Sequence, residues 1–160
     1  MYTFGTRQQL PISIDQAWDF FSDPSNLQII TPASMGFIIT GGYSKGEKVV
    51  AGMQISYKIK PLLRIPLNWV SQISKVDAPF CFTDIQVKGP YSYWRHQHFF
   101  KEIPGGIEMA DVVSYDIPYG IIGRLANTLF VSRMLKGIFD YRYKVLEKRF
   151  GRMKEGSVSA

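Results

Sequence analysis

Residues 121–150, IIGRLANTLFVSRMLKGIFDYRYKVLEKRF, are the longest stretch of the chain with helical periodicity. Apolar residues recur there every three or four positions, and the predicted apolar face includes Ile121, Leu125, Leu129 and Leu135. The pattern therefore predicts one amphipathic helix of about eight turns. Because this helix follows a series of strand patterns, it can cover the apolar face of an antiparallel sheet.

The segment between Gly36 and Tyr119 has a period of two, which is typical of strands. Residues 49–60 show the clearest alternation of apolar and polar side chains. Further strand patterns cover residues 67–73, 80–88, 93–103 and 107–117. Short connections rich in Gly and Pro separate them, so neighbouring strands are expected to pair as antiparallel hairpins.

One strand and two short helices are expected before this segment. Residues 2–12 are rich in strand formers, and Ser13 and Gln16 make a capping-box pattern for the first helix. Asp23-Pro24 ends that helix, and residues 25–28 repeat the capping pattern for a second. The sequence thus predicts an α+β fold (β-α-α, six more strands, then α), in which a curved antiparallel sheet of about seven strands wraps around the long C-terminal helix.

The chain has 160 residues, a length that suits one domain. We expect residues 1–150 to form it and residues 151–160 to be a flexible C-terminal tail. The single cysteine, Cys81, cannot form an internal disulfide, and no secretory signal or transmembrane run is evident, so a cytoplasmic location is expected.

The net charge of +6 would permit an anionic partner, but the excess of Lys and Arg lies mainly in residues 130–160. Cations near the C-terminus of a helix are favoured by its macrodipole. No nucleic-acid-binding motif accompanies them. We therefore expect no nucleic-acid partner, and a monomer or weak homodimer.

Several motifs resemble those of a known superfamily. They are WDFFSDPSNL at residues 18–27, TP at 31–32, FTDIQVKGPY at 82–91, WRHQHF at 94–99, DVVSY at 111–115, and Arg142. The chain resembles the START-like or Bet v 1-like (SRPBCC) helix-grip superfamily, within it a bacterial ligand-binding branch related to polyketide cyclase/dehydrase domains. The resemblance covers about residues 2–150, and it implies the fold far better than the activity.

Polar residues recur at alternate positions of three successive predicted strands, and alternate residues of a strand point to one face. The residues that share faces in this way are Asp84 and Gln86, then Trp94, His96 and His98, then Asp111 and Tyr115. Paired as hairpins, these strands would bring the polar groups together. His96, His98, Asp84 and Asp111 are therefore the candidate catalytic residues, and all seven residues are candidate ligand contacts.

Apolar residues are expected to form the walls of a cavity between sheet and helix, the usual form of a small-molecule site. The candidates are Met53, Ile55, Tyr57, Trp69, Phe130, Met134 and Ile138. Which face of each strand turns towards the cavity is not decided by the sequence.

Three interpretations of the polar group stay open. It is an interior hydrogen-bond network, or the polar end of a ligand site, or a His/Asp pair that moves a proton next to a carbonyl. His-x-His with a nearby aspartate also suggests a metal, but no fourth ligand is evident. We therefore predict no metal and no cofactor.

The expected function is the binding of a hydrophobic or amphipathic small molecule, lipid-like or polyketide/aromatic, between the sheet and the C-terminal helix. One alternative is a cyclase/dehydratase-type enzyme that uses a His/Asp pair. The other is a regulatory protein-interaction module, which a filled core without a void would favour.

Overall fold

The computed structural model describes residues 1–60 and 65–153. The strands are β1 (Tyr2–Leu10), β2 (Ile38–Gly41), β3 (Gln54–Ile59), β4 (Leu67–Asp77), β5 (Cys81–Lys88), β6 (Tyr93–Ile103) and β7 (Gly106–Asp116). The helices are α1 (Ile14–Phe21), α2 (Gly120–Ala126) and α3 (Ser132–Phe150), with 3₁₀ turns at Pro24–Gln28 and Ala33–Met35 and a π-helical segment at Asn127–Val131. Most of the tail predicted for residues 151–160 lies outside the described residues.

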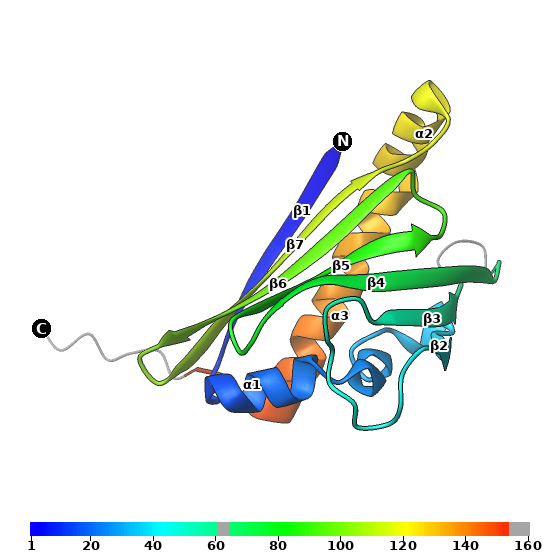
Figure 1. The fold of residues 1–160 in the computed structure, drawn as a ribbon. Coiled ribbons are helices and arrows are strands. Elements are labelled where there is room, and N and C mark those ends of the chain that lie inside the picture. The colour runs from blue at the N-terminus through cyan, green and yellow to red at the C-terminus, as the bar shows by residue number, and fades with distance from the viewer. Residues whose placement is uncertain (61–64, 154–160) are drawn as a thin grey trace, which may run out of the picture.

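The strands form one antiparallel sheet in the order β1-β7-β6-β5-β4-β3-β2. From β2 to β7 each strand pairs with the next one in the chain, as the short connections predict. β1 pairs with β7 and forms an edge of the sheet. Figure 1 shows the sheet curving around α3, with α1 across its lower end. The predicted α+β helix-grip architecture is confirmed.

The short helices follow local capping. Ser13 Oγ accepts a hydrogen bond from the amide of Gln16 at 3.2 Å, and Gln16 Oε1 accepts one from the amide of Ser13 at 2.9 Å, which confirms the predicted capping box. The second helix is the 3₁₀ turn Pro24–Gln28. Its cap is Asp23, which accepts from the amide of Ser25 at 2.9 Å, so Ser25 lies inside the 3₁₀ turn and does not cap it.

The strand expected at residues 49–60 is shorter. Only Gln54–Ile59 pairs with β4, because the chain before it turns at Gly52, whose φ is +90°. The amide of Val49 donates to the carbonyl of Ser22 at 2.8 Å. The residues before Gly52 therefore lie outside the sheet, next to the end of α1.

The C-terminal helix is interrupted by the π-helical segment, which inserts a wider turn and shifts the faces of the helix before it relative to α3. The predicted apolar face is wrong for Ile121, Leu125 and Leu129, which are 80%, 60% and 43% exposed. It is right for Leu135, which is buried against the sheet. None of the described helices is both long and apolar enough to span a membrane.

Two apolar clusters make up the core. One gathers around Ile107 and Met109 of β7 and Leu146 of α3. The other gathers around Val113 further along β7. Asp111, buried on the same face, lies between the two along β7, so a polar group separates the halves of the core.

Leu146→Ala tests the dependence of the fold on α3. Leu146 is fully buried in the larger cluster, so its truncation leaves a cavity and is expected to lower the free energy of unfolding by about 2–5 kcal/mol. Urea denaturation measures the loss. Lys144→Ala, on the exposed side of the same helix, is the control and should stay within about 0.5 kcal/mol of the parent protein. Equal effects of the two substitutions would contradict the observed packing of α3.

Candidate functional site

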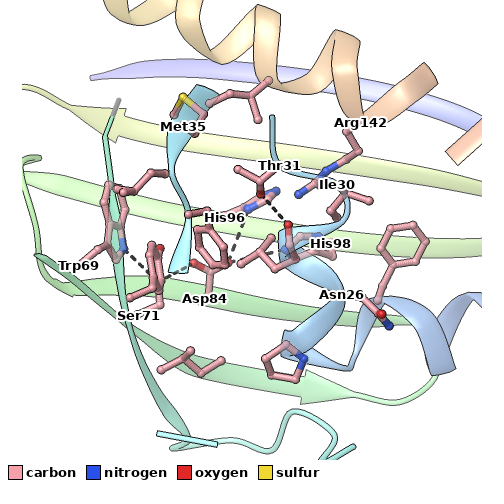
Figure 2. A pocket seen from close by; sticks show the side chains of 18 of the residues that line it. Asn26, Ile30, Thr31, Met35, Trp69, Ser71, Asp84, His96, His98 and Arg142 are labelled. Carbon is pink, nitrogen blue, oxygen red and sulfur yellow. Dashed lines mark hydrogen bonds and ion pairs between the residues drawn. The ribbon is translucent and has the colours of Figure 1, made fainter. Parts of the chain in front are cut away.

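A cavity of about 180 Å³ lies between the concave face of the sheet and α3. Its walls are mainly apolar and come from β3, β4, the 3₁₀ turn after α1, and α3. Asp84, His96, His98 and Arg142 form a polar patch in its wall (Figure 2). The site thus combines an apolar body with a small group of convergent polar side chains, which is the usual composition of a small-molecule pocket.

Strand register brings the polar residues together. Asp84 of β5 lies opposite His96 of β6, and Asp111 of β7 lies opposite His98. Burial alternates along β6, so His96 and His98 point inward while Gln97 between them lies on the other face. The expected convergence of hairpin-paired strands therefore occurs, on the concave face.

The carboxylate of Asp111 connects the sheet to α3. His96 Nε2 hydrogen-bonds to its Oδ1 at 3.0 Å, and Arg142 Nη1 of α3 donates to the same oxygen at 3.0 Å. His98 Nδ1 also lies 2.8 Å from Oδ1, although this contact lacks hydrogen-bond geometry. Within the described residues, Asp111 Oδ2 and Arg142 Nε have no hydrogen-bond partner. Three nitrogens thus converge on one buried oxygen.

Asp84 faces the other side of both imidazoles. Its Oδ2 lies 3.6 Å from His96 Nδ1 and 3.6 Å from His98 Nε2, too far for a hydrogen bond. Its Oδ1 accepts from Ser71 Oγ at 3.4 Å, and Ser71 in turn accepts from Trp69 Nε1 at 3.1 Å. Figure 2 shows this sequence of side chains crossing the sheet towards the histidines, with Arg142 reaching in from the helix.

The ionisable groups of the site shift one another's pKa values. Burial by itself raises the pKa of Asp111, but Arg142 and the two histidines outweigh burial and hold that pKa well below its usual value. Burial also opposes ionisation of Asp84, and the histidines outweigh it, so its pKa is lowered. Burial and the neighbouring His98 lower the pKa of His96. For His98, burial is outweighed by the two carboxylates, and the pKa is raised.

Most of the predicted contact residues face the cavity. Those that line it are Ile55, Tyr57, Trp69, Asp84, Trp94, His96, His98, Met134 and Ile138. Their role in binding stays a prediction.

Two predicted polar contacts serve the fold and do not line the cavity. Gln86 hydrogen-bonds through its side chain to the carbonyl and amide of Tyr91, at 2.7 and 3.2 Å. It thereby positions Tyr91, which does line the cavity. Tyr115 donates its hydroxyl to Asn127 Oδ1 at 2.8 Å and anchors the π-helical segment.

Three further predicted contacts also lie outside the cavity wall. Met53 sits in the turn before β3 and packs against the larger apolar cluster. Phe130 belongs to the π-helical segment and is 51% exposed, because the wider turn rotates it away from the sheet. Asp111 is completely buried in contact with the two histidines, so it acts on the site through them.

Arg142 and Ser71 belong to the site but are not among the predicted contacts. Arg142 lies four residues after Ile138 and four before Leu146, in the middle of the apolar face of the helix. A charged residue at such a position signals a buried ion pair, because Arg is rarely buried unpaired. Ser71 alternates with Trp69 on β4, which is the corresponding strand signal.

Solved structures share this architecture, whereas no family model and no curated protein matches the chain. A protein from Arthrobacter aurescens superposes with a TM-score of 0.69, at 9% identity over 99% of this chain and 93% of that chain. An AHSA1-like protein from Aeromonas hydrophila gives 0.60, at 14% identity over 97% and 99%. Ara h 8.0201 gives 0.58, at 12% identity over 92% and 98%. The likeness shows that the chain has the Bet v 1-like helix-grip (SRPBCC) fold inferred from its motifs.

Arg142→Met tests the ion pair that ties α3 to the sheet. The substitution places an unbranched apolar side chain at this position and removes the guanidinium from Asp111. Breaking a buried pair costs about 3–5 kcal/mol. Urea denaturation should show a loss of this size. Lys148→Met, at an exposed position of α3, is the matched control. A loss no larger than that of the control would mean that Asp111 does not depend on Arg142.

Proposed function

We propose that the protein binds a small hydrophobic or amphipathic molecule in the cavity between the sheet and α3. The apolar part of the molecule packs against the walls, and its polar group meets Asp84, His96 and His98. The observation that carries this proposal is a mainly apolar cavity of about 180 Å³ with the side chains of Asp84, His96 and His98 gathered at one place in its wall.

The cavity volume indicates how large the buried part of the ligand is. An apolar cavity of around 150 Å³ is large enough to bind benzene. The space here therefore suits one substituted ring or a short aliphatic chain. Within the lipid-like and aromatic classes expected from the sequence, it favours compact aromatic molecules over long acyl chains.

The aromatic walls favour a flat ligand. The Trp69 ring lies 5.8 Å from the ring of Tyr57, 5.5 Å from that of Tyr91 and 5.1 Å from that of Trp94, measured between centroids. Rings arranged in this way present both faces and edges, and an aromatic ligand can pack against either. This aromatic cluster supports a ligand with a ring at its centre.

The two alternatives stand differently. A protein-interaction module was expected to have a filled core, and the cavity weighs against it. A cyclase/dehydratase-type enzyme would use the same histidines and carboxylates, and it stays a prediction. Binding is the simpler proposal because it needs only the shape and polarity of the cavity.

Met134→Trp tests the cavity with p-cresol and toluene as probes. We expect p-cresol to bind the parent protein more tightly than toluene, because only p-cresol has a hydroxyl that can hydrogen-bond to the polar patch. Met134 lines the cavity, so a tryptophan there should fill it and raise the Kd for p-cresol at least roughly tenfold. Isothermal titration calorimetry measures both values.

The control is Arg133→Trp, which adds the same ring at an exposed position of α3 and should leave the Kd unchanged. Binding to the parent protein should also shift the indole N–H resonances of Trp69 and Trp94 in NMR spectra. The proposal is contradicted if neither probe binds the parent protein, or if Met134→Trp leaves the Kd for p-cresol unchanged.

A further inference from the structure

Three potential metal ligands meet at the polar patch in the cavity wall. Asp84, His96 and His98 each offer one ligand atom, and the three atoms lie within 4.8 Å of one another. Asp84 Oδ2 is 3.6 Å from a ring nitrogen of each histidine. That is too long for a hydrogen bond. It is close to the separation of about 3.4 Å that follows for two ligands bonded to one tetrahedral ion at roughly 2.1 Å.

We propose that Asp84 Oδ2, His96 Nδ1 and His98 Nε2 bind one divalent transition-metal ion, such as Zn²⁺. The absence of a fourth protein ligand led to the expectation of no metal from the sequence. Three protein ligands with one open position are, however, the arrangement of zinc sites that bind a further small molecule. The open side here faces the cavity, which the same three residues line.

Asp111 prepares the histidines for this role. Its Oδ1 lies 3.0 Å from His96 Nε2 and 2.8 Å from His98 Nδ1. The hydrogen bond at His96 Nε2 favours the tautomer whose N–H lies there, so that His96 Nδ1 carries the lone pair. The contact at His98 Nδ1 lacks hydrogen-bond geometry, but the negative charge 2.8 Å away still favours the proton on Nδ1 over Nε2. His96 Nδ1 and His98 Nε2 are the two nitrogens that face Asp84. A carboxylate behind each imidazole is also the usual outer partner of metal-bound histidine.

The surrounding charges and contacts fit a cation at this point. Among residues 1–60 and 65–153, the one guanidinium at the cluster is that of Arg142, and it is paired with Asp111, which leaves the carboxylate of Asp84 to face the ion. Ser71 holds the other oxygen of Asp84. Two imidazoles and one carboxylate suit Zn²⁺ and its first-row neighbours, whereas Mg²⁺ prefers sites made of oxygen ligands alone.

The metal site shares residues with the proposed ligand site but does not depend on it. A hydroxyl or carboxylate of a bound molecule would meet the open position of the ion. Metal binding can be measured without any organic ligand, and p-cresol binding can be measured in the presence of a chelator, so failure of one proposal is distinguishable from failure of the other.

The test is calorimetric titration of chelator-treated protein with Zn²⁺ and, separately, Mg²⁺. We expect one Zn²⁺ per chain and no Mg²⁺. Asp84→Asn keeps the shape of the side chain, and His98→Gln removes one imidazole. Each substitution should raise the Kd for Zn²⁺ at least roughly 100-fold, because a three-ligand site loses a ligand. Asp111→Asn, which meets the ion only through the rings but also loses its ion pair with Arg142, should raise that Kd by about 10–100-fold in protein that circular dichroism shows to be folded.

Two further measurements separate ligation from loss of structure. Gln97→Ala, on the opposite face of β6, should bind Zn²⁺ like the parent protein. The chain contains only two histidines, so the imidazole ¹⁵N resonances of the folded parent protein report on this site alone, and Zn²⁺ should shift both. The proposal is overturned if the parent protein takes up no Zn²⁺, if Mg²⁺ binds equally well, or if folded Asp84→Asn and His98→Gln retain the parent Kd.

Discussion

The buried carboxylate of Asp111 is the contact on which the arrangement of helix and sheet depends. It lies on β7, forms an ion pair with Arg142 of α3, and contacts both histidines of β6. A charge withdrawn from water costs several kcal/mol unless a partner of opposite charge meets it. Arg142 must therefore face the sheet at this level, and this requirement sets the rotation of α3 about its own axis.

The same carboxylate explains why the interior consists of two apolar clusters with polar side chains between them. Along β7 the inward positions are apolar on both sides of Asp111, and each apolar stretch belongs to a separate cluster. The polar side chains lie between the two clusters, where they form hydrogen bonds and ion pairs with one another. The cavity adjoins these polar side chains, so the polar patch in its wall follows from the way the ion pair is built into the core.

The sequence predicts the sheet and the convergence of the site well because alternation and short connections are local signals. Asp84, His96, His98 and Asp111 meet once the strands pair as hairpins, and the registers of β5, β6 and β7 are those of consecutive hairpins.

The rest depends on contacts distant in the sequence or on irregular backbone. The π-helical turn breaks the 3.6-residue period without an evident signal, so Phe130 is predicted on the wrong side of the helix. Gln86 and Tyr115 share strand faces with the site residues, yet their hydrogen-bond partners, Tyr91 and Asn127, lie in a turn and a helix. Strand alternation alone cannot distinguish these structural roles from contact with a ligand.

The pairing of the first strand with the last has a consequence for how the chain acquires its structure. Residues Tyr2–Leu10 find their partners only at Ile107–Tyr115, and Gln8 also donates its side-chain amide to the carbonyl of Tyr143. During synthesis the N-terminal strand must wait until most of the polypeptide has left the ribosome. Contacts so remote in sequence slow folding, because the intervening loop must close first. The pairing of the first strand with the last therefore belongs to the later part of folding, after the intervening strands have been made.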